Sequence, residues 1–154
     1  MTLMDITISP SRPTNADTLV FAVPKDGLTT VGVAASRTLV DGARAARFSG
    51  DAGTTFESFV EEAGQTVRVV LLGTGNGSDA DMEKAGGALT ARLATSGATH
   101  AAVEFPMAAS AAAASRLAFG ARLRGWRIDT YRTRLPEKAK PTLTAITVVN
   151  GVGE

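Results

Sequence analysis

Several residue types are scarce or missing in this sequence, and each absence removes a class of function. Cysteine is absent, which excludes disulfides, thiolate metal sites and cysteine nucleophiles. His100 is the single histidine and precedes an apolar run, so we interpret it as structural, not as part of a metal cluster or a Ser-His-Asp triad. No apolar stretch is long enough to span a bilayer, and the N-terminal stretch MTLMDITISP lacks the features of a secretory signal. The net charge of +1 offers no general attraction to membranes, so we expect a cytoplasmic protein without a membrane partner.

Alternating and continuous apolar runs predict strands separated by helices along the chain. The strands are expected at residues 6–8, 19–23, 54–60, 67–72, 100–105 and 143–149. The helices are expected at residues 34–48, 79–96 and 108–124, with Gly125 ending or kinking the last one. Residues 126–141 are basic and fit neither pattern. This order predicts an α/β fold over a single domain, residues 1–154, built as a three-layer α/β/α sandwich. Its sheet is expected to be mixed but mostly parallel, with some antiparallel pairing near the N-terminus.

A glycine-rich turn follows the most strongly predicted strand, in the stretch VRVVLLGTGNGSDADMEKAGG. A dinucleotide fingerprint needs glycine at its first, third and sixth positions, and the sixth position here is Ser78. A phosphate P-loop needs lysine and then serine or threonine where this chain has Asp79 and Ala80. Both nucleotide motifs therefore fail. The glycines of the turn remain a weak candidate for a phosphate loop: Gly73, Gly75 and Gly77.

Acidic residues occupy the start of the helix that follows this turn. Asp79, Asp81 and Glu83 fall in its first turns, where carboxylates complement the positive end of the helix dipole. They would repel a phosphate at the same place. Ser78 is a good N-cap residue. We therefore interpret the turn as a tight strand-to-helix connection. The other acidic residues show no metal-ligand spacing, and no catalytic or metal-binding residue is predicted.

One stretch, ARLRGWRIDTYRTRLPEKAK, departs from the balanced charge of the rest of the chain. Its arginines and lysines far outnumber its acids, and Trp126 and Tyr131 are interleaved among them. Arginine with aromatic residues can dock another protein surface or bind nucleic acid, and cations also suit a solvated helix end. We favour a docking surface combined with a solvated helix end, and place nucleic acid third. The candidate residues are Arg122, Arg124, Trp126, Arg127, Tyr131, Arg132 and Arg134.

Two long stretches resemble the N-terminal domain of leucyl (cytosol) aminopeptidases. The first is VRVVLLGTGNGSDADMEKAGGALTARLATSGATHAAVEFP, which is similar to the family's strand, acidic helix start, A-G-G-A-like helix and second strand. The second is LAFGARLRGWRIDTYRTRLPEKAKPTLTAITVV, which resembles the family's G-x-x-L-x-x-Y-R-F-D-x-Y-K-T-K segment and closing strand. The residues in those places are Gly120, Leu123, Trp126, Arg127, Ile128, Asp129, Tyr131, Arg132, Thr133 and Arg134. Trp126 and Arg132 depart mildly from the family's tyrosine and lysine.

The resemblance implies a macro-domain-like α/β fold and a non-catalytic domain. In that family the peptidase centre binds two divalent metal ions, zinc or manganese, in a C-terminal domain with the signature N-T-D-A-E-G-R. This sequence does not contain that signature, so the resemblance assigns no catalytic, metal or cofactor residue to it. The implied partners are the chain's own C-terminal catalytic domain and, in a hexameric parent enzyme, further copies of the protein. The chain is then either a truncated form of such an enzyme or a stand-alone copy of the domain, of which we favour the first, and we expect a role in assembly or regulation.

Two alternatives to that role remain open at the level of the sequence. The implied fold and the glycine turn would also suit a macro-domain-like binder of nucleotides or ADP-ribose, although this rests mainly on fold analogy. The basic stretch would suit a DNA-binding accessory domain, because some members of the resembled family bind DNA. The acids at the helix start argue against the first alternative, and the low net charge argues against the second.

Overall fold

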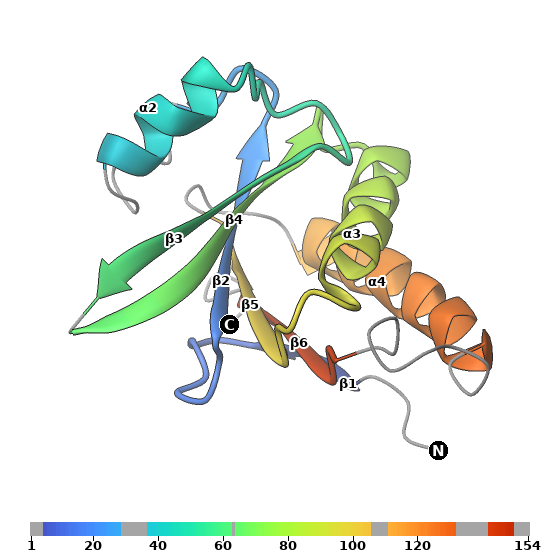
Figure 1. Cartoon of the computed structure of the whole chain (residues 1–154). Helices are drawn as coiled ribbons and strands as arrows, with labels where there is room; N and C mark the ends of the chain where they lie inside the picture. The colour runs from blue at the N-terminus through green and yellow to red at the C-terminus, as the bar shows by residue number, and fades with distance from the viewer. Residues whose placement is uncertain (1–4, 29–36, 63, 106–110, 132–141, 150–154) are drawn as a thin grey trace.

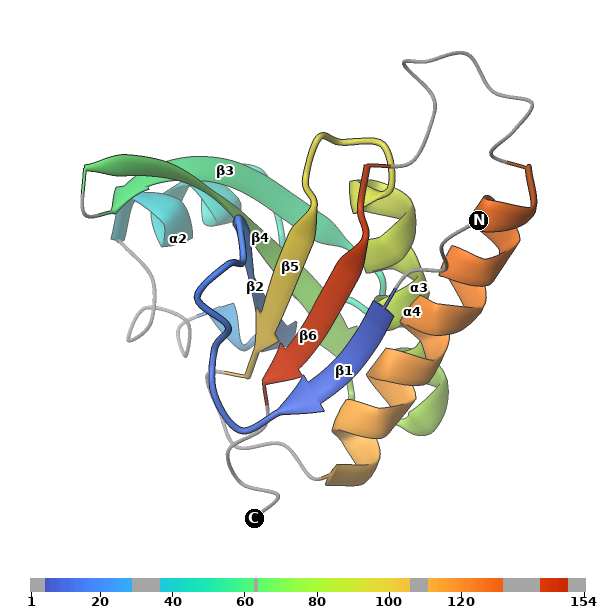
Figure 2. The same cartoon turned by 90° about the horizontal axis from the view of Figure 1, so that it is seen from below.

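The computed structural model describes residues 5–28, 37–62, 64–105, 111–131 and 142–149, with the backbone alone at residues 62 and 127–131. Its centre is a six-stranded sheet of order β1-β6-β5-β2-β4-β3 (Figures 1 and 2). The strands are β1 (Asp5–Ser9), β2 (Thr18–Pro24), β3 (Thr55–Glu62), β4 (Gln65–Gly75), β5 (His100–Glu104) and β6 (Ala145–Val149). Every predicted strand is therefore present, and β4 is longer than its apolar run.

The pairing of the strands corrects one expectation. All neighbours run parallel except β3 and β4, which are antiparallel. The expected antiparallel pairing near the N-terminus is wrong, because β1 pairs in parallel with β6 and places Ile6 beside Ile146. The antiparallel pair is instead formed by two strands that follow each other closely in the chain. A short connection can join only antiparallel neighbours, whereas parallel strands need a long crossover.

Helices cover both faces of the sheet, as a three-layer sandwich requires. The described helices are α2 (Arg37–Ala45), α3 (Asp79–Leu93) and α4 (Ala111–Tyr131). Figure 1 shows α2 on one face and both α3 and α4 on the other. The predicted helix at residues 34–48 is confirmed over Arg37–Ala45 as α2, which ends before the expected residue 48. Its expected first residues lie outside the described part of the chain.

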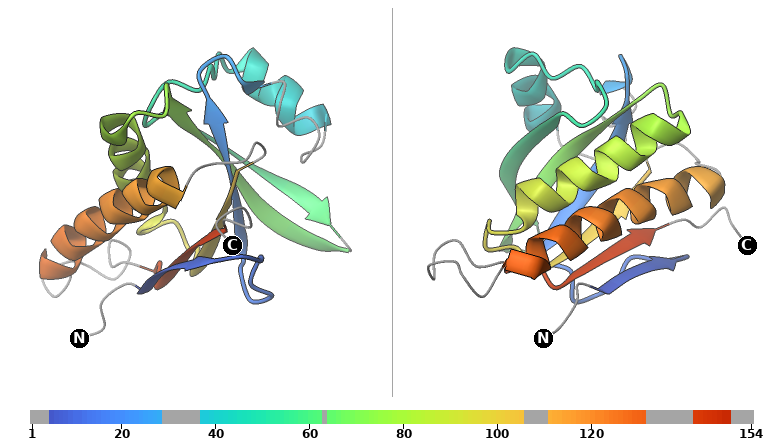
Figure 3. Two further views of the ribbon diagram at one scale, coloured as in Figure 1. Left: turned by 180° about the vertical axis from the view of Figure 1, so that it is seen from behind. Right: turned by 90° about the vertical axis from the view of Figure 1, so that its right-hand side faces the viewer.

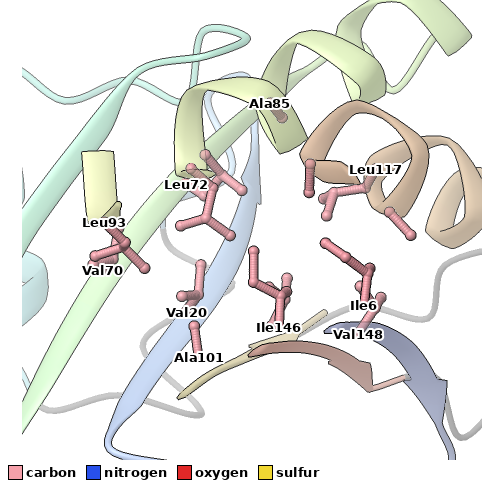
Figure 4. Close-up of a cluster of buried hydrophobic side chains, with 14 of the residues drawn as sticks. Ile6, Val20, Val70, Leu72, Ala85, Leu93, Ala101, Leu117, Ile146 and Val148 are labelled. Carbon is pink, nitrogen blue, oxygen red and sulfur yellow. The ribbon is translucent and has the colours of Figure 1, made fainter. Parts of the chain in front are cut away.

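Side chains alternate between the two faces along each central strand and build two cores. On β4, Val70 and Leu72 pack toward α3 and α4, while Val69 and Leu71 pack toward α2. The larger core also contains Leu117 of α4 and residues from every strand except β3 (Figure 4). Strands buried on both faces explain why the sequence shows continuous apolar runs there.

The last helix also differs from its prediction. Helix α4 continues through Gly125 to Tyr131, so the expectation that Gly125 ends it is wrong. A glycine inside a helix costs about 1 kcal/mol relative to alanine, which is a weak local penalty. Trp126, Arg127 and Tyr131, left unplaced by the sequence, thus belong to this helix.

The layer formed by α3 and α4 depends on two glycines. A side chain at Gly86 of α3 would overlap the carbonyl oxygen of Leu117, and one at Gly120 of α4 would overlap that of Glu83. The Thr90 hydroxyl donates a buried hydrogen bond of 3.1 Å to the carbonyl of Ala121 across the same contact. Figure 3 shows the two helices side by side over the sheet. The backbones approach this closely only because neither glycine has a Cβ.

An aspartate ties the beginnings of two central strands together. The carboxylate of Asp17, just before β2, accepts hydrogen bonds from the Thr99 amide at 3.0 Å, the Thr99 hydroxyl at 2.7 Å and the His100 amide at 3.2 Å. Burial alone would raise the pKa of Asp17. The hydrogen bonds from Thr99, His100 and Thr18 outweigh burial and hold the pKa below its ordinary value.

The glycine contact predicts opposite effects for two neighbouring substitutions. Gly86→Ala should lower the free energy of unfolding by about 1–3 kcal/mol, because the added methyl group forces α3 and α4 apart. Gly87→Ala is the matched control, since the nearest atom to its added Cβ is the Gly120 carbonyl oxygen at 3.7 Å. It should raise the free energy of unfolding by about 0.5–1 kcal/mol through helix propensity. Urea unfolding followed by circular dichroism measures both, and equal effects would contradict the close contact.

The aspartate network predicts a stability difference that depends on pH. Because the folded-state pKa of Asp17 is lowered, its ionised form adds stability above the unfolded pKa of about 3.9, and this is lost as the pH falls through the folded value. Asp17→Asn should lower the free energy of unfolding by about 1 kcal/mol at pH 7. The gap between wild type and variant should shrink at pH 2.5 in the same urea titration. A gap of equal size at both pH values would be inconsistent with the network.

Candidate functional site

Of the three candidate glycines, Gly73 and Gly75 lie at the end of β4 and Gly77 lies in the connection to α3, and they serve close packing or backbone conformation. A Cβ at Gly73 would overlap the carbonyl oxygen of Asp51, and one at Gly75 would lie 2.7 Å from Asp81 Oδ2. Gly75 and Gly77 have φ values of +58° and +77°, which favour glycine. The loop of residues 49–54 therefore presses against the end of β4 and leaves no room for a side chain at Gly73 or Gly75. Gly77 has open space around it and is favoured by its φ alone.

The backbone amides of these glycines are already engaged. Gly73 N–H donates to the Thr54 carbonyl at 2.8 Å, Gly75 N–H to that of Gly50 at 2.9 Å, and Gly77 N–H to that of Thr74 at 3.0 Å. Open α/β sheets bind ligands beyond the carboxyl ends of their parallel strands, which is where this turn lies. A phosphate would have to compete with three hydrogen bonds that join the chain to itself.

The helix start after the turn is capped as the sequence predicts. The Ser78 side chain accepts a hydrogen bond of 3.1 Å from the Asp81 amide and is the N-cap of α3. Asp81 in turn accepts a hydrogen bond of 2.9 Å from the Asn76 amide. The carboxylate of Asp81 therefore joins the first turn of α3 to the backbone of the preceding turn. The negative charge at this helix end belongs to the protein itself.

The basic stretch divides between structural arginines and an outward surface. Arg122 Nη2 donates a hydrogen bond of 3.0 Å to the carbonyl of Ile6 and anchors α4 to β1. Arg124 is exposed on the same helix. Arg127 and Tyr131 are part of α4, where only their backbone is described. The remaining candidates, Arg132 and Arg134, lie outside the described residues.

Large apolar side chains form a line along the outer side of α4. Phe119, Leu123 and Trp126 are 50%, 43% and 60% exposed, and their spacing places them on one side of the helix. Sequence reasoning included Trp126 but not Phe119 as a site residue, because it ended the helix before Gly125. The spacing of four and then three residues was the signal that could have found the line.

A further charged cluster links the β3–β4 hairpin to α3. Glu57 lies 3.0 Å from Arg92 Nη2 and 3.4 Å from Arg68 Nε. Arg68 also donates a hydrogen bond of 3.0 Å to the carbonyl of Ser96 and lies over the ring of Phe59, 5.1 Å from its centre. Sequence patterns gave no sign of this cluster, because its members lie far apart in the chain. Its contacts hold the β3–β4 hairpin against α3 and the residues that follow it.

The single histidine contacts a side chain of a neighbouring strand. His100 Nε2 lies 2.8 Å from the Thr147 hydroxyl on the neighbouring strand β6. Within the described ranges, no group of three or more His, Cys, Asp or Glu side chains is arranged to hold a metal ion. The described residues therefore do not fit the two-metal centre that the resemblance implies for the parent enzyme. None of the described helices is both long and apolar enough to cross a membrane.

Comparison with known proteins identifies curated relatives that are much longer than this chain. A probable cytosol aminopeptidase of Afipia carboxidovorans is 32% identical over 111 residues, covering 69% of this chain and 22% of that protein. A probable cytosol aminopeptidase of Caulobacter vibrioides is 33% identical over 106 residues, covering 66% of this chain and 21% of that protein. The chain thus spans about a fifth of the length of the curated relatives it matches.

Solved structures share the fold. A tomato leucine aminopeptidase mutant superposes with a TM-score of 0.64 at 17% identity, covering 99% of this chain and 34% of that one. The bottromycin maturation enzyme BotP in complex with Mn superposes with a TM-score of 0.61 at 20% identity, covering 88% of this chain and 27% of that one. The model of the cytosol aminopeptidase family N-terminal domain matches residues 21–135. The chain therefore belongs to the cytosol aminopeptidase family, as its N-terminal domain.

Proposed function

We propose that this chain is a non-catalytic N-terminal domain that assists the assembly or regulation of a cytoplasmic aminopeptidase. The match of residues 21–135 to the family's N-terminal domain carries the proposal. The parent enzyme would remove N-terminal amino acids from peptides, and its chemistry would reside in a C-terminal catalytic domain. That domain is the first partner of this chain, and further copies in a hexamer are the second.

The metal ions of the parent enzyme are assigned to the same C-terminal domain. One related fold is a maturation enzyme solved in complex with Mn, which supports manganese as a metal for such proteins. We propose two divalent ions, zinc or manganese, in the parent. They would supply an activated water and polarise the peptide carbonyl when bound. The residues of this chain would act by packing and docking.

The geometry favours this role over nucleotide or ADP-ribose binding. The carboxyl-end turn, where an α/β fold would bind such a ligand, is packed by the loop of residues 49–54. The amides of Gly73, Gly75 and Gly77 are bonded to carbonyl groups of the chain. The protein's own packing thus explains Gly73 and Gly75, and the positive φ explains Gly77.

The proposal predicts that the pure chain lacks peptidase activity. The 154-residue protein, incubated with Mn²⁺ and leucine p-nitroanilide, should release p-nitroaniline no faster than buffer with Mn²⁺. An intact leucine aminopeptidase in the same buffer is the positive control. Absorbance at the p-nitroaniline band measures the rate. Turnover that co-purifies with the chain and scales with its concentration would contradict a non-catalytic role.

A further inference from the structure

We infer that the outer face of α4 is a docking surface for an apolar protein surface with carboxylates at its edge, supplied by the family's metallopeptidase domain. We define the α4 outer face as Phe119, Leu123 and Trp126, with Arg124 at its border. The identity of the partner rests on the proposed function. The surface itself rests on the exposure, rigidity and charge of α4.

Helix α4 carries apolar side chains on its buried side and on its exposed side. Ala114, Leu117 and Ala121 are fully buried on the inner side of the helix. Phe119, Leu123 and Trp126 project on the opposite side, so the helix is apolar on both sides. Large apolar side chains that are exposed next to one another mark an interaction site more often than singly scattered ones do. The other exposed large hydrophobic residues in the described part of the chain, Ile8 and Phe59, stand singly on separate strands.

Contacts with α3 and β1 hold the α4 outer face in place before any partner binds. Gly120 lets α4 approach α3 closely. Arg116 is 2.7 Å from Glu83, and Arg122 is bonded to the carbonyl of Ile6. The helix is therefore fixed to both a neighbouring helix and an edge strand. A surface fixed in this way loses little conformational freedom when it binds.

The charged side chain at the border of the α4 outer face is positive. Arg116 is paired with Glu83 at 2.7 Å and Asp79 at 3.7 Å, and Arg122 is bonded to the carbonyl of Ile6. The exposed cation at the border of the α4 outer face is therefore Arg124. A partner with carboxylates beside an apolar patch matches this pattern. The apolar centre of the stripe favours a protein over nucleic acid, whose contacts are mainly to phosphates.

In the longer relatives, the domain is joined to a further large part of the same polypeptide. The chain covers 22% and 21% of two curated relatives and 34% of the tomato structure. In those proteins a large remaining segment belongs to the same polypeptide. Covalent linkage gives that segment a high effective concentration at the domain, so a patch of three side chains can be occupied stably. The metallopeptidase portion of the relatives is therefore the committed occupant.

The absence of cysteine from the chain allows a direct footprint of this surface. Leu123→Cys places a thiol on the α4 outer face, and Ile8→Cys is the matched control because Ile8 is similarly exposed on β1. Each variant is prepared as the 154-residue chain and as a fusion that replaces the N-terminal domain of the Caulobacter vibrioides relative. Maleimide labelling at the new thiol is followed by peptide mass spectrometry. Leucine p-nitroanilide turnover by the fusion shows that its catalytic portion is folded.

The docking proposal predicts a difference between the two thiols. In the fusion, L123C should label at least about ten-fold more slowly than in the isolated chain, whereas I8C should label equally in both. Adding Arg124→Glu to the fusion should restore fast labelling of L123C, and Lys25→Glu, the same charge change in the turn after β2, should not. Equal rates for L123C in an active fusion would overturn the proposal.

Two other outcomes would replace the committed occupant. If L123C labels slowly in the isolated chain and the rate rises on dilution, a second copy covers the surface. If the isolated chain shifts duplex DNA in low salt and Arg124→Glu abolishes the shift, the surface binds nucleic acid. The fusion test is independent of whether the isolated chain hydrolyses peptides. Failure of the docking proposal is thereby distinguished from failure of the non-catalytic role.

Discussion

The contact between α3 and α4 is the constraint on which the rest of this structure depends. Gly86 and Gly120 let two helix backbones touch, and the Thr90 hydroxyl bonds across the contact. This approach places Leu117 into the core against the sheet. It also fixes the direction of the opposite side of α4, which carries Phe119 and its exposed neighbours. Core and candidate surface are thus two sides of one helix.

Local elements were predictable from sequence because their signals are local. Each apolar run became a strand, and Ser78 became the N-cap that its type suggested. The sheet order was not predictable, since β1 and β6 stand at opposite ends of the chain and no local pattern states which strands are neighbours. The prediction that α4 ends at Gly125 was wrong for a related reason. The propensity cost of this glycine is local, whereas the contacts that hold α4 at Gly120 and Arg122 come from α3 and β1, which are distant in the sequence.

The two candidate sites show how one residue type can suggest different functions. Glycines after a strand suggest a phosphate loop, but here Gly73 and Gly75 give room to another loop of the same chain. Arginines near aromatics suggest nucleic acid, but Arg122 anchors a helix to the edge of the sheet. What remains after these structural roles is an apolar stripe with a basic border. That remainder suits a protein partner, which agrees with membership of a family whose curated relatives are far longer than this chain.

The central claim is that this domain works by presenting the outer face of α4 to a metallopeptidase domain. The most direct measurement is an experimental structure, by electron cryo-microscopy, of this chain fused to the catalytic portion of a family member. The account predicts that Phe119, Leu123 and Trp126 are buried against that portion, with carboxylates near Arg124. A structure in which this side of α4 faces solvent, while the catalytic portion contacts another part of the domain, would contradict it.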